Sequence, residues 1–183
     1  MKFVKTLLVV AALGAAFTAQ AESNIASGAA PNLQASARLN FNVVIPRVLY
    51  LRVGTGTDFT PNTQVDTETF TAAAGNIGTG TAIAGVPAGF SARVLSTGGG
   101  ISLAATGSGT GLTNPGLAVI PWTQISGTSV GALAVPAVGA TNNLAAVNGV
   151  VAQSGTWSFS YANAATLAAG TYAGVVTYTA TLP

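Results

Sequence analysis

The chain closes on GTYAGVVTYTATLP (residues 170–183), a stretch rich in Thr, Val and Tyr with a single internal glycine. β-Branched and aromatic residues of this kind favour a β-strand, and we expect one over Thr171–Leu182. A strand at the end of a chain depends on whatever pairs beside it, and a second chain can supply that neighbour. The stretch therefore predicts an all-β protein whose last strand takes part in assembly.

Further strand-like runs precede this segment, separated by turn signals such as Gly98–Gly100, Asn114–Gly116 and Asn148–Gly149. We expect strands at Val48–Val53, Phe90–Ser96, Ile101–Ala105, Leu117–Ile125 and Trp157–Tyr161, with weaker candidates at Val130–Val135 and Val147–Val151. Outside the first 21 residues, no segment predicts a helix. Many short strands without helices favour an antiparallel β-sandwich, with a barrel as the second choice.

The longest alternation in the chain runs from Leu33 to Ile45. Its odd positions are apolar, and the strongest of them are Leu33, Leu39, Phe41, Val43 and Ile45. All even positions but the last are polar, so a strand here would have one apolar and one polar face. Because the run is long for one globular strand, we expect it either to bend and serve two sheets or to extend beyond its own domain.

The N-terminus has the three parts of a secretory signal peptide. Lys2 and Lys5 supply positive charge, Leu7–Phe17 is apolar, and Ala19-Gln20-Ala21 is a small-residue cleavage site. We therefore expect export from a bacterial cytoplasm, with the periplasm in transit and the cell surface or an extracellular fibre as the destination. The predicted organisation is a signal peptide (1–21), an N-terminal extension that is a possible donor strand (22–35) and one β-sandwich domain (36–183).

Removal of the signal peptide changes the charge of the chain. The sequence has six basic and four acidic residues, and loss of Lys2 and Lys5 leaves four of each, so the mature formal charge is zero. Four scattered arginines give no electrostatic footprint for nucleic acid or anionic lipid, and we expect no nucleic-acid partner. A neutral surface opposes self-association only weakly.

The residue types argue against catalysis, and we expect no enzyme, no cofactor and no metal site. The chain lacks His and Cys, and the mature part also lacks Lys, so a Ser or Thr nucleophile has no such base to activate it. Asp58, Asp66 and Glu68 could offer oxygen ligands to calcium, but their spacing matches no EF-hand or RTX pattern, and a solvated loop is favoured.

The aromatic and basic side chains have two interpretations each. Trp157, Phe159 and Tyr161 share one face of a strand, which is either a sugar-binding platform or, as we favour, buried core; the same holds for Trp122. We expect the arginines at 38, 47 and 52 to flank an apolar face, without forming a cluster, and to limit aggregation.

The segment LAAGTYAGVVTYTAT (residues 167–181) resembles the closing segment of archaic chaperone–usher pilins, also called spore-coat-U-like proteins. Gly170, the fourteenth residue from the end, resembles a glycine of such pilins, and VIPWT (residues 119–123) resembles the family's apolar-Pro-aromatic stretch. The chain departs from the family in lacking the disulfide that many pilins have and in carrying Leu182 where an aromatic residue is common.

The resemblance implies an immunoglobulin-like sandwich that lacks one strand. A periplasmic chaperone, working with an outer-membrane usher, would fill the gap until the N-terminal extension of the next subunit replaces it. The implied donor residues lie within Asn24–Ile45 and are Leu33, Leu39, Phe41, Val43 and Ile45. The implied acceptor groove is bordered by Val176, Tyr178, Ala180 and Leu182. Main-chain bonds would give affinity and alternate side chains would give register.

The expected function is that of a structural subunit in a non-covalent bacterial surface fibre, pilus-like and used in adhesion or biofilm. Its partners would be copies of itself or related subunits. Sortase-type isopeptide linkage is not expected because the mature chain has no Lys. Two alternatives stay open: a self-contained secreted β-sandwich that binds a ligand, and a small outer-membrane β-barrel.

Overall fold

The computed structural model describes residues 22–29 and 31–183, so the predicted signal peptide lies outside the described residues. The chain divides into two units, Met1–Ile45 and Pro46–Pro183. We call the second the folded unit. The domain start expected at residue 36 therefore falls within the first unit, and the folded unit begins at Pro46.

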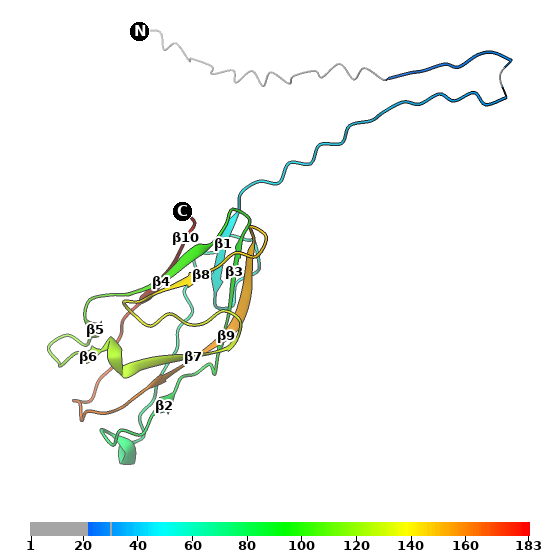
Figure 1. Ribbon diagram of the computed structural model, residues 1–183. Coiled ribbons are helices and arrows are strands. Elements are labelled where there is room, and N and C mark those ends of the chain that lie inside the picture. The colour runs from blue at the N-terminus through cyan, green and yellow to red at the C-terminus, as the bar shows by residue number, and fades with distance from the viewer. Residues whose placement is uncertain (1–21, 30) are drawn as a thin grey trace, which may run out of the picture. The chain divides into compact units, whose positions relative to one another are not determined.

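The folded unit is built from antiparallel β-strands with almost no helix, which confirms the all-β prediction. The strands are β1 Leu49–Val53, β2 Ile83–Ala84, β3 Phe90–Ser96, β4 Ile101–Gly107, β5 Gly111–Leu112, β6 Ile120–Pro121, β7 Ile125–Gly131, β8 Thr141–Leu144, β9 Val151–Tyr161 and β10 Val176–Thr181 (Figure 1). Two short 3-10 turns, Ala74–Asn76 and Trp122–Gln124, complete the elements. Among the described residues, neither turn has the length and apolar character needed to cross a membrane.

The strands form two main sheets and a small hairpin. The first sheet has the order β1-β3-β9-β2, with β7 also paired to β9, and the second has the order β10-β4-β8. The hairpin pairs β5 with β6. Every strand pair is antiparallel.

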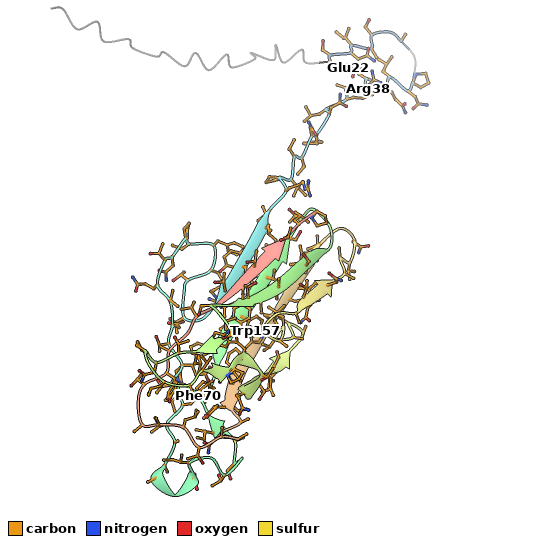
Figure 2. The ribbon with its side chains drawn as sticks, turned by 90° about the vertical axis from the view of Figure 1, so that its left-hand side faces the viewer. Glu22, Arg38, Phe70 and Trp157 are labelled. Atoms are coloured by element: carbon orange, nitrogen blue, oxygen red, sulfur yellow. The ribbon has the colours of Figure 1, made fainter. Side chains whose placement is uncertain are left out.

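One hydrophobic core joins the two main sheets. Buried positions alternate along β3 and β4, as the two-residue period of a strand requires. The first sheet contributes Ala92, Val94, Val151 and Trp157, and the second contributes Ile101 and Leu103. Trp157 is fully buried, and its Nε1 donates to the carbonyl oxygen of Leu133 at 2.8 Å (Figure 2). The core interpretation of Trp157 is thus confirmed.

Two predicted strands are shorter than expected, and Trp122 lies at both places. The strand expected over Leu117–Ile125 is interrupted because Trp122–Gln124 forms a 3-10 turn. The half-buried Trp122 ring lies against Gly174, where an added Cβ would come within 2.8 Å of the ring. In the strand expected over Thr171–Leu182, the residues before β10 make only one isolated bridge, between Ala173 and Thr113. Trp122 is therefore a half-buried residue that packs over Gly174, and it is not a core residue.

The strand expected over Leu33–Ile45 does not form. None of the strand pairings or bridges among the described residues involves residues 31–45. A β-strand is stable only when a neighbour accepts its backbone hydrogen bonds, so alternation alone does not create one. Within the first unit, Arg38 Nε contacts the Glu22 carboxylate at 2.9 Å (Figure 2). This hydrogen bond lowers the pKa of Glu22.

Candidate functional site

The last strand, β10, has one paired and one open edge. Among the described residues β10 pairs only with β4, and just before it Ser108 N–H donates to Val175 O at 2.8 Å. In an antiparallel ladder, successive residues bond alternately to the partner and away from it. Counting from Val175, the three threonines of β10 bond to β4. The backbone N–H and C=O groups of Val176, Tyr178 and Ala180 consequently point to the open edge.

The first strand, β1, has a matching open edge. It pairs only with β3 in the described structure, and bonds from Gly54 N–H to Ser91 O (2.8 Å) and from Thr97 N–H to Val48 O (3.1 Å) fix the phase. By the same alternation, the backbone groups of the strand's odd-numbered residues point away from β3. These residues are Leu49, Leu51 and Val53.

These two edges are neighbours, and together we call them the open edge. β1 and β10 lie side by side (Figure 2). A cleft of about 550 Å³ is lined by β1, by parts of the loop at 55–66 and by Tyr178. At one end of the pair, Arg47 Nη2 donates to Pro183 O at 2.9 Å. Each row of unpaired backbone groups is a template to which a further strand can add.

The four predicted acceptor residues share one face. Val176, Tyr178, Ala180 and Leu182 are all half-buried and alternate with exposed neighbours. The last three pack against the core, and the Tyr178 ring centroid is 5.0 Å from that of Trp157. Burial, with a smaller contribution from the charge of Glu68, raises the pKa of Tyr178 to about 12. This hydroxyl therefore stays protonated at neutral pH.

The five predicted donor residues are all solvent-exposed. The exposed fractions are 49% for Leu33, 76% for Leu39, 86% for Phe41, 82% for Val43 and 76% for Ile45. Their odd numbering would place them on one face if the segment were extended. The described structure pairs none of them with another strand. The donor residues are thus exposed apolar side chains with an unsatisfied preference for burial.

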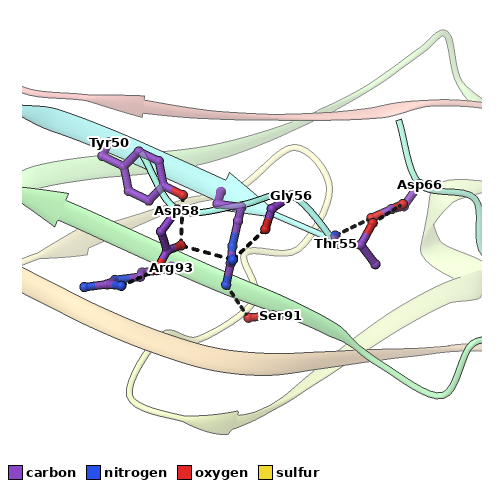
Figure 3. Close-up of polar contacts among 8 residues, drawn as sticks. Tyr50, Thr55, Gly56, Asp58, Asp66, Ser91 and Arg93 are labelled. Carbon is purple, nitrogen blue, oxygen red and sulfur yellow. Dashed lines mark hydrogen bonds and ion pairs between the residues drawn. The ribbon is translucent and has the colours of Figure 1, made fainter. Parts of the chain in front are cut away.

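The three acidic residues of the polar stretch lie in different places. Asp66 accepts from the backbone N–H (2.6 Å) and hydroxyl (2.9 Å) of Thr55, which closes the loop at 55–66 (Figure 3). Glu68 is half-buried. Burial raises its pKa more than the hydrogen bond from the backbone N–H of Phe159 lowers it. Among the described residues no three His, Cys, Asp or Glu side chains gather as a metal site would require. Each acid therefore acts separately.

Two arginines meet at Asp58, and this cluster was not expected from the sequence. Asp58 accepts a hydrogen bond from the Tyr50 hydroxyl at 3.0 Å, lies 3.1 Å from Arg52 Nη1 and contacts Arg93 Nη1 (Figure 3). Burial raises the pKa of Asp58, but these hydrogen bonds and charges outweigh it, and the net shift is downward. Arg52 and Arg93 meet here because pairing of β1 with β3 places them directly opposite each other.

Sequence reasoning also missed the contribution of β1 to the open edge. The strand itself was expected from its composition, but nothing local says which strands end up at a sheet edge.

A scan against protein-family models, a search of curated proteins and a search of solved structures each found no match for this chain.

Proposed function

We propose that this protein is a structural subunit of a non-covalent bacterial surface fibre that assembles by β-strand addition. In this proposal the folded unit is an immunoglobulin-like, pilin-like β-sandwich that is incomplete on one side. The supporting observation is the open edge, where β1 and β10 turn unpaired backbone groups outward beside side chains that face the core. A strand added at β1 or at β10 would extend that sheet.

The donor in this proposal is residues 33–45 of a second copy. An extended strand placed at the open edge directs alternate side chains toward the core, which matches the apolar odd positions of the segment. Burial of one large apolar side chain stabilises by about 1.5–3 kcal/mol. Several such side chains would outweigh part of the cost of ordering the segment and joining two chains.

An open edge next to an apolar face is also prone to aggregation. A subunit of this kind needs protection before it assembles. We therefore include a periplasmic chaperone and an outer-membrane usher as partners, with export as the route to the cell surface.

A self-contained binding protein is the second candidate. The observation that favours it is the contact between Arg47 and Pro183, which links β1 and β10 at one end without any donor. In this alternative the loop at 55–66 and the residues lining the cleft are the finished surface of a monomer. Assembly distinguishes the two candidates directly.

The test compares Val43→Asp with the matched control Asn42→Asp in cells that produce the full chain. Both variants add the same negative charge, on opposite faces of an extended segment. Material sheared from the cells is run unboiled and boiled on a gel and imaged by negative stain. We expect a boiling-sensitive ladder and thin filaments for the wild type and the control, and monomers alone for Val43→Asp because its charge would be buried without a partner.

Unchanged multimers in Val43→Asp would contradict the donor assignment. A wild type that is monomeric and forms no filaments would contradict the fibre and favour the binding protein. Equal loss of multimers in both variants would show that charge, and not the apolar face, controls assembly.

A further inference from the structure

A second feature lies on the outer face of the first sheet, away from the core. Arg52 and Arg93 are directly opposite each other in the β1–β3 register. Like charges at such positions repel, and Asp58 lies between them as their shared counter-ion. Because one carboxylate neutralises only one of the two guanidinium groups, the group of Arg52, Arg93 and Asp58 has a net charge of one positive unit.

The two arginines differ in how fully their donors are used. Arg52 donates to Gly56 O at 2.7 Å and to the Ser91 hydroxyl at 2.8 Å, and it also contacts Asp58. Among the described residues, the only side-chain hydrogen bond of Arg93 goes from Nη1 to Asp58, and 40% of its side chain is exposed. Nε and Nη2 of Arg93 therefore remain for a ligand. These two donors form the planar fork that matches a carboxylate.

Arg93 is one of the residues that line a pocket of about 360 Å³. Its polar lining consists of the two arginines with Asp58, Ser91, Gln153 and Ser154. Phe59 lies beside it, 54% exposed, with its ring centroid 5.4 Å from the Arg93 guanidinium carbon and 4.5 Å from the Tyr50 ring centroid. Phe59 has a left-handed backbone, with φ of 59°. A bulky side chain seldom adopts this conformation, and here it holds an aromatic ring at the surface.

We propose that this pocket, which we call the Arg93 pocket, binds the carboxylate of an acidic sugar such as a uronic acid. The guanidinium fork would hold the carboxylate, the serine hydroxyls would bond to sugar hydroxyls, and Phe59 would contact the apolar edge of the ring. The volume falls within the range of small-ligand sites. This inference does not depend on the proposed fibre, because its residues lie on the opposite face of β1 and β3 from the core.

The test titrates the exported protein with glucuronate, glucose and acetate by isothermal calorimetry at low salt. Arg93→Gln is compared with the control Arg47→Gln, which removes the same charge elsewhere in the folded unit. We expect saturable binding of glucuronate, weaker binding of acetate and none of glucose. Arg93→Gln should weaken glucuronate binding by at least about tenfold, and Arg47→Gln should leave it unchanged.

Absence of saturable glucuronate binding, or equal binding by Arg93→Gln, would overturn the proposal. Equal affinities for acetate and glucuronate would overturn the sugar part, since the pocket would then recognise only a carboxylate. If Arg93→Gln does not fold, Arg93→Lys replaces it. Lysine keeps the charge and loses the fork, so weaker binding by this variant supports the proposal and unchanged binding contradicts it.

Discussion

The two sides of the folded unit differ in how the space between the sheets is closed. On one side, residues 132–140 cross from β7 in the first sheet to β8 in the second. Leu133 and Pro136 of this segment are fully buried, Leu133 N–H donates to Ser154 O at 3.1 Å, and Leu133 O accepts from Trp157. On the other side, β1 and β10 form the open edge, and the described structure contains no strand that bridges them.

This difference shows that closure depends on a chain segment that changes sheets. Residues 132–140 bring apolar side chains to the core, and their backbone bonds to β9 and to β4, where Gly139 N–H donates to Ala105 O at 2.8 Å. The loop at 55–66 follows β1 but closes on its own start through Asp66 and Thr55. It therefore leaves the backbone groups of β1 and β10 unpaired.

The largest effect is expected from truncating one leucine on each side. Leu133→Ala should destabilise the protein by about 3 kcal/mol, because it empties a fully buried site on the closed side. Leu49→Ala removes a side chain that is 40% exposed on the open edge and should cost less than about 1 kcal/mol. Urea unfolding of both variants measures the contrast. Equal losses would mean that the two sides are packed alike and would remove the comparison.

Proline substitutions test the assignment of paired and unpaired backbone groups along β10. Thr179→Pro removes an N–H that bonds to β4 and should cost about 2 kcal/mol, since the β4 carbonyl loses its partner. Ala180→Pro removes an N–H that points to the open edge and should cost less than about 1 kcal/mol. Unfolding measurements give the stabilities, and gels of sheared material give assembly.

In Ala180→Pro, assembly should be affected far more than stability. Ala180→Pro should fold and yet lose multimers, because the added strand would meet a proline in place of a donor. A destabilised Ala180→Pro together with an unaffected Thr179→Pro would show that the alternation along β10 has the other phase. A stable variant with normal multimers would move the acceptor away from β10.

The smallest effect concerns Glu68, whose Oε1 is buried without a hydrogen-bond partner in the described structure. Burial raises its pKa above 4.5, so the protonated form favours folding and this contribution is lost as pH rises through the folded-state pKa. Glu68→Gln should therefore stabilise the protein at pH 7 by about 1 kcal/mol or less, and the gain should vanish near about pH 4. Unfolding at both pH values tests this. The exposed Glu22→Gln should give no gain, and a loss of stability in Glu68→Gln would contradict the prediction.

The strands predicted best are those with regular alternation between clear turns. Phe90–Ser96 was expected with the bounds that β3 has, and Val48–Val53 and Ile101–Ala105 were each close to β1 and β4. β8 was missed because Thr141–Leu144 contains two asparagines and alternates weakly. Its pairing with β4 stabilises a sequence that reads locally as a loop.

The candidate site was predictable in part, because one of its strands alternates regularly. Alternation along residues 176–182 correctly indicated one half-buried face, since neighbouring side chains of a strand point to opposite sides. The cluster of Arg52, Arg93 and Asp58 was not predictable, because its members are brought together by strand register and by the path of a loop.

The sequence by itself determined that the protein is all-β, which side chains of its regular strands face inward, and where several of its turns lie. These features depend on neighbours along the chain, and local residue types encode them. Only the tertiary structure decided that β1 and β10 are neighbouring edge strands, that residues 132–140 cover the core on the opposite side and that residues 31–45 stay unpaired. Edges and closures depend on hydrogen-bond partners distant in sequence, and no local pattern specifies which strand finds which partner.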